Sequence, residues 1–316
     1  MLYKIDTEKG EGIELAKDQA VRGVPTFVMM NAEGEALDRW VGYGKEMFIE
    51  SLSGALGDLT TIEEKRARFA ANPTAADAAK LASYHSSIGD YAEAVRLYRE
   101  AEGMNQDPSV DYLFEIFDNT VDGLRDSTYT LDDVRATADA VVSSGQAEAD
   151  DLVWVAVQTN RLGKARGDQH LLTAYLQPAI DASAGTEDEG LARWRQRLLV
   201  EHALYVQERP LLAVEYKKKS MNENWTESAR ELNSFCWWCF ESKVNLEEAE
   251  TLARKAVSLA SPGQEKAQIL DTLAEIYNAR GNPDHAVHAM TQAVAEAPDS
   301  KYYAEQLERF RGLTGS

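Results

Sequence analysis

The feature that most constrains the fold is a spacing of small and bulky residues that recurs about two glycines. Around Gly281 the spacing runs Leu273, Ala274, Tyr277, then Ala286, Met290, Ala293 and Pro298. The same offsets about Gly89 hold Leu81, Ala82 and His85, then Ala94, Tyr98 and Ala101. Alanines at helical intervals on both sides of a glycine predict two helices that pack closely across a tight turn.

This two-helix spacing resembles the tetratricopeptide repeat family. A third copy is expected from Leu232 to Leu259, with Ala249, Ala253 and Ala256 in register and Val244 in place of the glycine. Ala249 and Ala286 are 37 residues apart, against about 34 for this class of repeat, so we expect an insertion of about one turn. The resemblance implies stacked helix pairs that bind protein or peptide partners.

Between residues 109 and 220 the period stays helical while the repeat spacing fades. The expected helices are Asp111–Phe117, Leu131–Ser143, Asp151–Leu162, Leu171–Ala182, Leu191–Gln207 and Leu211–Lys219. They fit either divergent repeats of one array or a separate helical bundle. Capping boxes are expected at Thr61–Glu64 and Asn245–Glu248, with a weaker one at Thr130–Asp133.

The first sixty residues follow a different pattern, in which strands and helices alternate. Strands are expected at Leu2–Asp6, Val24–Met30 and Ala36–Tyr43, and short helices at Gly12–Lys17 and Lys45–Leu56. Turn residues Asn31–Gly34 join the last two strands into a hairpin. The apolar face of the second helix is expected to comprise Met47, Phe48, Leu52 and Leu56.

This order, with the run Val21–Phe27 and with Gly34 and Val41–Tyr43, resembles the second half of the thioredoxin family. The resemblance implies a cis peptide bond before Pro25 and a substrate-binding loop of Val24, Pro25 and Thr26. There the peptide group of Val24 would bond to an extended substrate by strand addition. The alternative interpretation makes Pro25 an ordinary proline at the start of a strand.

The sequence lacks the dithiol half of that fold, so no catalytic residue is predicted. In the family a further strand lies between those that resemble Leu2–Asp6 and Thr26–Met30. We therefore expect either lost upstream sequence or a repacked, poorly ordered half. An incomplete sheet with open edges also predicts self-association. The expected fold class is α+β, mostly α: a partial thioredoxin-like domain at residues 1–60 and a tetratricopeptide-like helical domain at 61–316.

Other residues that could carry chemistry have plainer alternatives. Cys236 and Cys239 could form a redox dithiol, but their apolar neighbours favour packing as small hydrophobes. His285 and His288 have the spacing of two metal ligands, yet no second cluster completes a site, and no metal or cofactor is predicted. Trp154, Trp194 and Trp225 are expected to fill the core.

Charge excludes one class of partner. The chain of 316 residues has 33 basic and 53 acidic side chains, a formal charge of −20, and no basic patch. Nucleic acid is therefore not an expected partner. Apolar runs are too short for membrane insertion, and Met1 opens no signal-peptide pattern. Localisation is left open between cytoplasm and, if an upstream signal exists, the cell envelope.

Two functions remain. The first is a thioredoxin-family thiol–disulfide protein or fragment that recognises substrate with the Val24–Thr26 loop and partners with its repeats. It would be redox-inactive as written, and an intact parent would carry an upstream Cys-x-x-Cys. The alternative is a non-enzymatic scaffold in which the repeats bind proteins.

Overall fold

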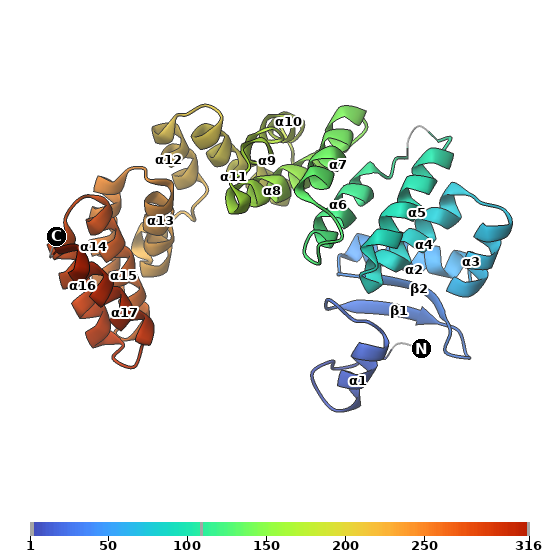
Figure 1. The fold of residues 1–316 in the computed structure, drawn as a ribbon, viewed down its shortest axis with the longest axis horizontal. Helices are drawn as coiled ribbons and strands as arrows, with labels where there is room; N and C mark the ends of the chain where they lie inside the picture. Colours follow the sequence, from blue (N-terminus) through green and yellow to red (C-terminus); the bar gives the residue numbers. More distant parts are fainter. Residues whose placement is uncertain (1–2, 108–109, 315–316) are drawn as a thin grey trace. The chain divides into compact units, whose positions relative to one another are not determined.

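The computed structural model describes residues 3–107 and 110–314, which form a succession of helices and one small sheet (Figure 1). The chain divides into two compact units: unit 1 is Met1–Pro178 and unit 2 is Ala179–Ser316. The predicted domain boundary at residue 60 lies inside unit 1 and stays a prediction.

Unit 1 begins with a hairpin between helices. The elements are α1 (Glu11–Asp18), β1 (Thr26–Met30), β2 (Ala36–Val41) and α2 (Lys45–Gly57). β1 and β2 are antiparallel, with Phe27 opposite Trp40, and the register shifts between Met29 and Met30. The hairpin turn is held by the Asn31 side chain, whose Oδ1 accepts from the amides of residues 33 and 35. The predicted hairpin is therefore confirmed.

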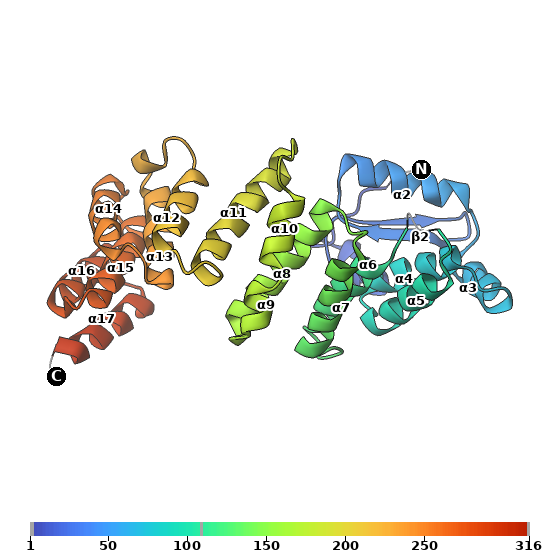
Figure 2. The same ribbon diagram turned by 90° about the horizontal axis from the view of Figure 1, so that it is seen from above.

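The hairpin lies between α2 and the repeat helices (Figure 2). Phe48 of α2 packs against Phe27 and Trp40, with ring centroids 5.0 and 5.9 Å apart. On the repeat side, Lys80 Nζ contacts the Asp38 carboxylate at 2.6 Å. The predicted apolar face of α2 is partly wrong, because Leu56 is 57% exposed and Ala55 is buried instead.

The predicted strand Leu2–Asp6 is not present in its described part, residues 3–6, and Leu2 lies outside the described residues. The sheet of the described chain has two strands, not three. Tyr3 and Ile5 are exposed. Their alternation has no neighbouring strand to bond with, and an isolated extended segment gains no ladder hydrogen bonds that would hold it.

The rest of unit 1 is helical. Its helices are α3 (Ile62–Ala71), α4 (Ala75–Ile88), α5 (Tyr91–Met104), α6 (Leu113–Gly123), α7 (Leu131–Ser144), α8 (Ala149–Arg166), α9 (Gln169–Thr173) and α10 (Leu176–Ala182), the last of which runs to the start of unit 2. The single helix expected at Leu171–Ala182 is thus two. Pro178 lacks the N–H that would bond to the carbonyl of Ala174, and this missing hydrogen bond favours a break between the two helices.

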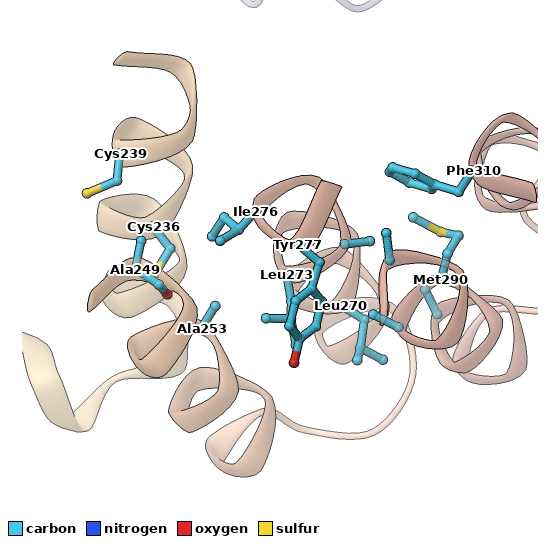
Figure 3. Close-up of a cluster of buried hydrophobic side chains, with 14 of the residues drawn as sticks. Cys236, Cys239, Ala249, Ala253, Leu270, Leu273, Ile276, Tyr277, Met290 and Phe310 are labelled. Carbon is cyan, nitrogen blue, oxygen red and sulfur yellow. The ribbon is translucent and has the colours of Figure 1, made fainter. Parts of the chain in front are cut away.

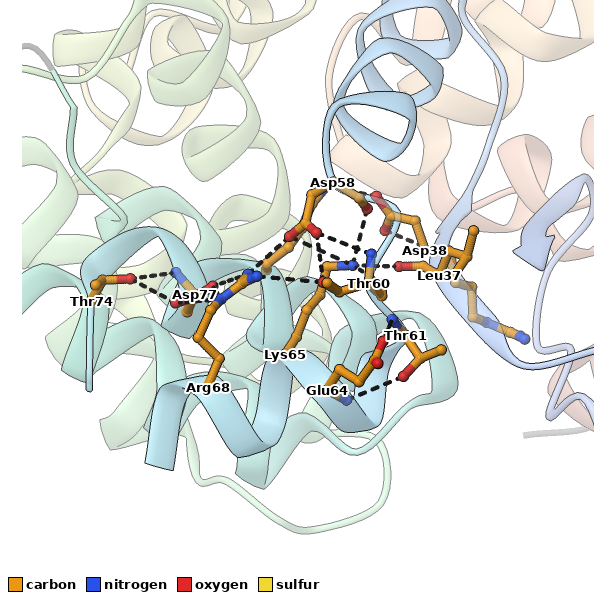
Figure 4. Close-up of polar contacts among 12 residues, drawn as sticks. Leu37, Asp38, Asp58, Thr60, Thr61, Glu64, Lys65, Arg68, Thr74 and Asp77 are labelled. Atoms are coloured by element: carbon orange, nitrogen blue, oxygen red, sulfur yellow. Dashed lines mark hydrogen bonds and ion pairs between the residues drawn. The ribbon is translucent and has the colours of Figure 1, made fainter. Parts of the chain in front are cut away.

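A polar network joins the hairpin to α3 (Figure 4). Lys65 is 1% exposed, and its Nζ donates to the carbonyls of Leu37 at 3.0 Å, Asp58 at 3.3 Å and Thr60. The α3 N-terminus carries the predicted capping box, with Thr61 and Glu64 each bonded to the other's amide. The box at Thr130–Asp133 is also confirmed.

Unit 2 is a series of helix pairs. Its helices are α11 (Glu189–Tyr205), α12 (Pro210–Lys219), α13 (Ala229–Ser242), α14 (Leu246–Leu259), α15 (Gln264–Ala279), α16 (Pro283–Glu296) and α17 (Lys301–Thr314), with a 3-10 turn at Trp225–Glu227. The capping box predicted at Asn245–Glu248 is wrong. Asn245 has a left-handed backbone (φ 51°), and its side-chain amide instead donates to the Glu248 carboxylate at 2.6 Å.

The core of unit 2 lies between the paired helices (Figure 3). The contact alanines predicted for the three helix pairs are fully buried in both units. They are Ala94 and Ala101 in unit 1, and Ala249, Ala253, Ala286 and Ala293 in unit 2. In unit 2, Phe235, Met290 and Phe310 fill the space that these small side chains leave. The helix-pair prediction is therefore confirmed at these positions.

Two of the three tryptophans expected in the core are not there. Trp154 and Trp194 are each more than a third exposed. Trp154 Nε1 donates to Asp118 Oδ1 at 2.9 Å, and Arg197 lies 4.7 Å from the centre of the Trp194 ring. Trp225 is partly buried and packs against Phe235 at the edge of the core.

Candidate functional site

A concave feature of unit 1, with a volume of about 470 Å³, lies on the first helix of the α4–α5 pair. Three small residues of α4 face it: Ala76, Ala79 and Ser83. Their spacing of three and four places them on one helical face. Because none of them carries a long side chain, this face forms a shallow, open depression, called the α4–α5 groove below.

Two tyrosines form one wall of this groove. Tyr98 comes from α5 and Tyr112 from the N-cap of α6, and their ring centroids are 6.1 Å apart. Burial raises the pKa of the Tyr98 hydroxyl, so it stays protonated and can donate. Tyr98 itself is 7% exposed, so the aromatic surface that this wall offers comes mainly from Tyr112.

Glu115 supplies the acidic group of the groove. This half-buried carboxyl lies in the first turn of α6. Burial, and then the nearby Asp151, Asp111 and Asp118, raise its pKa to about 7. A carboxyl that is costly to ionise becomes a strong acceptor site once a cation or donor arrives.

The basic groups of the groove already have partners. Lys80 pairs with Asp38. Arg68 holds Asp77 through Nε at 3.0 Å and Asp58 through Nη2 at 2.9 Å (Figure 4). The Arg68 guanidinium lowers the pKa of both carboxyls. Among the described residues, Glu115 is thus the acidic lining residue that these pairs leave without a basic partner.

The predicted substrate-binding loop lies elsewhere in unit 1. The Val24–Pro25 peptide bond is cis, the geometry that the thioredoxin resemblance implies. Val24 is 74% exposed, and Thr26 Oγ1 donates to the carbonyl of Gly23 at 2.6 Å. Arg22 anchors the loop, since its Nη1 donates to the Gly89 carbonyl at 2.9 Å. Binding by Val24, Pro25 and Thr26 stays a prediction.

β1 follows this loop and has one unpaired edge. The Pro25 carbonyl accepts from the Gly42 amide across the hairpin at 2.8 Å. Because backbone groups alternate in direction along a strand, those of Thr26 and Val28 point away from β2. The sheet has no third strand among the described residues, so these groups are available to an extended segment.

The two cysteines lie in unit 2 and are fully buried (Figure 3). Cys236 Sγ contacts the carbonyl of Ala249 at 3.3 Å. Burial raises the pKa of both thiols to about 12. This environment fits the packing alternative, because a reactive thiolate needs a lowered pKa and access.

The histidine pair does not gain a third ligand. His285 and His288 are exposed on α16, and His285 stacks on the Tyr277 ring. No cluster of three or more His, Cys, Asp or Glu in the described ranges could hold a metal ion. None of the helices described is long and apolar enough to cross a bilayer.

Sequence reasoning missed the groove itself and identified only Tyr98, as a repeat position. The sequence does contain a signal that could have located the groove. Its residues Ala76, Ala79 and Ser83 precede Gly89 by offsets that differ from those of the buried repeat positions. Glu115 and Tyr112 come from a later helix, and only the packing of α6 on α5 brings them there.

In the comparison with known proteins, one family model matches the helix pair that carries this groove. A family model described as "Tetratricopeptide repeat" matches residues 74–101, which include α4 and most of α5. A search of curated proteins found no match. The matched segment is the helix pair that forms the recessed face, so this part of the chain has a tetratricopeptide-like repeat.

Several solved structures are similar over most of the chain at low identity. The APC/C hetero-tetramer Cut9-Hcn1 matches at 14% identity and a TM-score of 0.39, over 78% of this chain and 45% of that one. TTC0263, a thermophilic TPR protein in Thermus thermophilus, matches at 16% identity and a TM-score of 0.27, over 75% of this chain and 98% of that one. BtubC (BKLC) from P. vanneervenii matches at 15% identity and a TM-score of 0.31, over 81% of this chain and 88% of that one. This chain thus spans less than half of the first of these.

Proposed function

We propose that this chain is a non-enzymatic interaction scaffold whose α4–α5 groove binds a segment of a protein partner. The observation that carries the proposal is the recessed face of α4, bordered by two tyrosines and by a carboxyl without a counter-ion among the described residues. Small residues leave room for a side chain, the tyrosines offer apolar contact, and Glu115 offers an acceptor.

The chemistry of the groove favours a partner segment with an apolar or aromatic residue next to a basic one. The apolar residue would lie on Ala76 and Ala79, where the surface is recessed. The basic residue would bond to Glu115, whose ionisation it would restore. The charge of −20 would speed the approach of a basic partner.

A blocked groove tests this function. Peptides would be selected from a displayed random library against the parent, and their affinity measured by calorimetry. Ala76→Trp fills the recess and should weaken the affinity for the selected peptides by about tenfold or more. Ala92→Trp, at an exposed alanine of α5 outside the groove lining, is the matched control and should change affinity less than about twofold.

The position of the bound peptide is a second test of this function. Amide shifts on binding should map to α4, α5 and the start of α6. Selected peptides that bind both tryptophan variants equally well, or a selection that enriches nothing over background, would contradict the assignment.

We also propose a second, narrower role: residues 1–60 are the thioredoxin-like part, and the loop of Val24, Pro25 and Thr26 with the β1 edge takes up an extended strand. The open edge and the exposure of Val24 support this. β1 reads Thr-Phe-Val-Met-Met and carries none of the charges that protect edge strands, so a second copy of the chain is the expected occupant.

Val28→Pro tests the strand role. The Val28 amide points to the open edge, so proline there should leave the β1–β2 ladder intact while blocking addition. Analytical ultracentrifugation of the parent should show a dimer that forms with rising concentration, and Val28→Pro should be monomeric. A parent chain that stays monomeric at every concentration measured would contradict this role.

A further inference from the structure

The groove of the α4–α5 pair has an equivalent face in unit 2, and its chemistry is different. The groove residues of α4 stand 13, 10 and 6 positions before the turn glycine, as Ala76, Ala79 and Ser83 before Gly89. The same offsets before Gly281 fall on α15 at Gln268, Asp271 and Glu275. The equivalent face of α15 therefore carries two acids where α4 carries small residues.

Asp271 is a buried acid on this face with incomplete hydrogen bonding. Its side chain is 7% exposed. Oδ2 accepts from the Tyr302 hydroxyl of α17 at 3.2 Å, whereas Oδ1 is buried and has no hydrogen-bond partner among the described residues. A buried carboxylate oxygen without a donor is costly, so a donor that reached Oδ1 would be bound favourably.

The nearby charges compensate Asp271 only in part. Glu275 lies one turn further along α15 and repels it. Arg309 of α17 is the cation in reach, and it forms its ion pair with Glu275. Asp271 and Glu275 therefore share a single cation within the described part of the chain.

Tyr302 is a cover that can move. It is 48% exposed, and its contact of 3.2 Å with Asp271 is long for a hydroxyl donor. An exposed side chain changes rotamer on the picosecond to nanosecond timescale. Rotation of Tyr302 away from α15 would break this hydrogen bond and leave Oδ2 of Asp271 free as well.

We infer that this face of α15, with Asp271 as acceptor and Tyr302 as its cover, is a subsite for a lysine ammonium of a protein partner. The ammonium supplies the donor that Oδ1 lacks and the cation that the Asp271–Glu275 pair lacks. It is compact and donates in three directions, so it can bond to Asp271 and to the Tyr302 oxygen together. A guanidinium is larger and planar and pairs best with both oxygens of an accessible carboxylate, whereas the Asp271 carboxylate is almost fully buried, so the compact ammonium fits better.

The subsite extends the proposed scaffold function to a second groove and rests on different residues. A partner that lies in a repeat groove would place its lysine here by charge complementarity. The α4–α5 groove holds none of these groups, so its own test succeeds or fails independently.

The probe is the peptide Ac-Ala-Ala-Lys-Ala-Ala-NH2, with its Nε-acetyl-lysine counterpart as the matched ligand. Amide NMR shifts of the full chain would be followed for residues 264–279 and 301–309. The lysine peptide should give saturable shifts there, with a millimolar Kd expected for one subsite. The acetylated peptide, which has lost the charge, should give none.

Two variants complete the test. Asp271→Asn should weaken the lysine peptide by about tenfold or more. Asp299→Asn, the same change at an exposed position between α16 and α17, should leave Kd within about twofold. Thermal melts establish that both variants are folded. Saturable binding that survives Asp271→Asn, equal shifts from both peptides, or no shift from the lysine peptide up to about 20 mM overturns the inference.

Discussion

Lys65→Met removes the buried ammonium that joins the hairpin to α3. Methionine keeps the unbranched apolar stem, so the cavity stays filled. What is lost is the donor to three backbone carbonyls, those of Leu37, Asp58 and Thr60. The ion pair with the Asp58 carboxylate, at 3.8 Å, is lost as well.

Two effects oppose each other in this variant. Each carbonyl left without its donor costs about 1–3 kcal/mol. In the other direction, methionine avoids the desolvation that lowers the pKa of Lys65. Apolar residues replace buried ion pairs without loss when both partners are replaced, but backbone carbonyls cannot be replaced. The loss should therefore prevail, at about 2–4 kcal/mol.

Hydrogen exchange measures this loss locally. Amides of β2 and α3 should exchange roughly 30- to 700-fold faster, since each 1.4 kcal/mol is a factor of about ten. Lys17→Met is the control, because its side chain is 67% exposed in a pair with Glu14, and it should cost less than about 0.5 kcal/mol. Protection of β2 within about twofold of the parent in Lys65→Met would refute the reasoning.

Three further outcomes are expected. Ala286→Leu adds volume at a fully buried helix contact and should lower stability by about 1–3 kcal/mol, so a thermal melt equal to the parent's would contradict the packing. Cys236 and Cys239 should label with a thiol reagent only on unfolding, and the chain should not reduce insulin; fast native labelling of both would reopen the redox alternative. Burial raises the pKa of Asp271 from 3.8 to about 6, so the folded state binds the extra proton and the parent loses stability as pH rises through this window. Asp271→Asn should therefore be about 1–3 kcal/mol more stable than the parent at pH 8 and equal to it near pH 4, as chemical denaturation at both values will show.

The helix pairs could be predicted from sequence because their determinants are local. Gly89 and Gly281 stand at turns with positive φ, and the alanines at fixed offsets from them are buried. Thr61 and Glu64 cap α3 through groups only three residues apart. Each of these signals needs no knowledge of distant contacts.

The failures share a dependence on distant partners. The alternation at Leu2–Asp6 predicts a strand, but a strand needs a neighbour to bond with, and residues 3–6 have none in the described sheet. Trp154 is predicted as a core residue, yet its indole lies on the surface beside Asp118 of another helix. Glu115 reaches the groove only because α6 packs on α5, a contact that periodicity does not encode.

The two turn glycines differ in their tolerance to mutation. Both have the left-handed backbone, at φ 79° for Gly89 and 78° for Gly281, so any side chain adds strain at either. A Cβ at Gly281 would meet nothing within 4 Å, and asparagine, which accepts this backbone, would fit. A Cβ at Gly89 would overlap the guanidinium of Arg22, displacing the arm that ties the cis-proline loop to the repeat. Replacement at this position of the repeat therefore leaves the surroundings unchanged in unit 2, whereas in unit 1 it requires the Arg22 side chain to move.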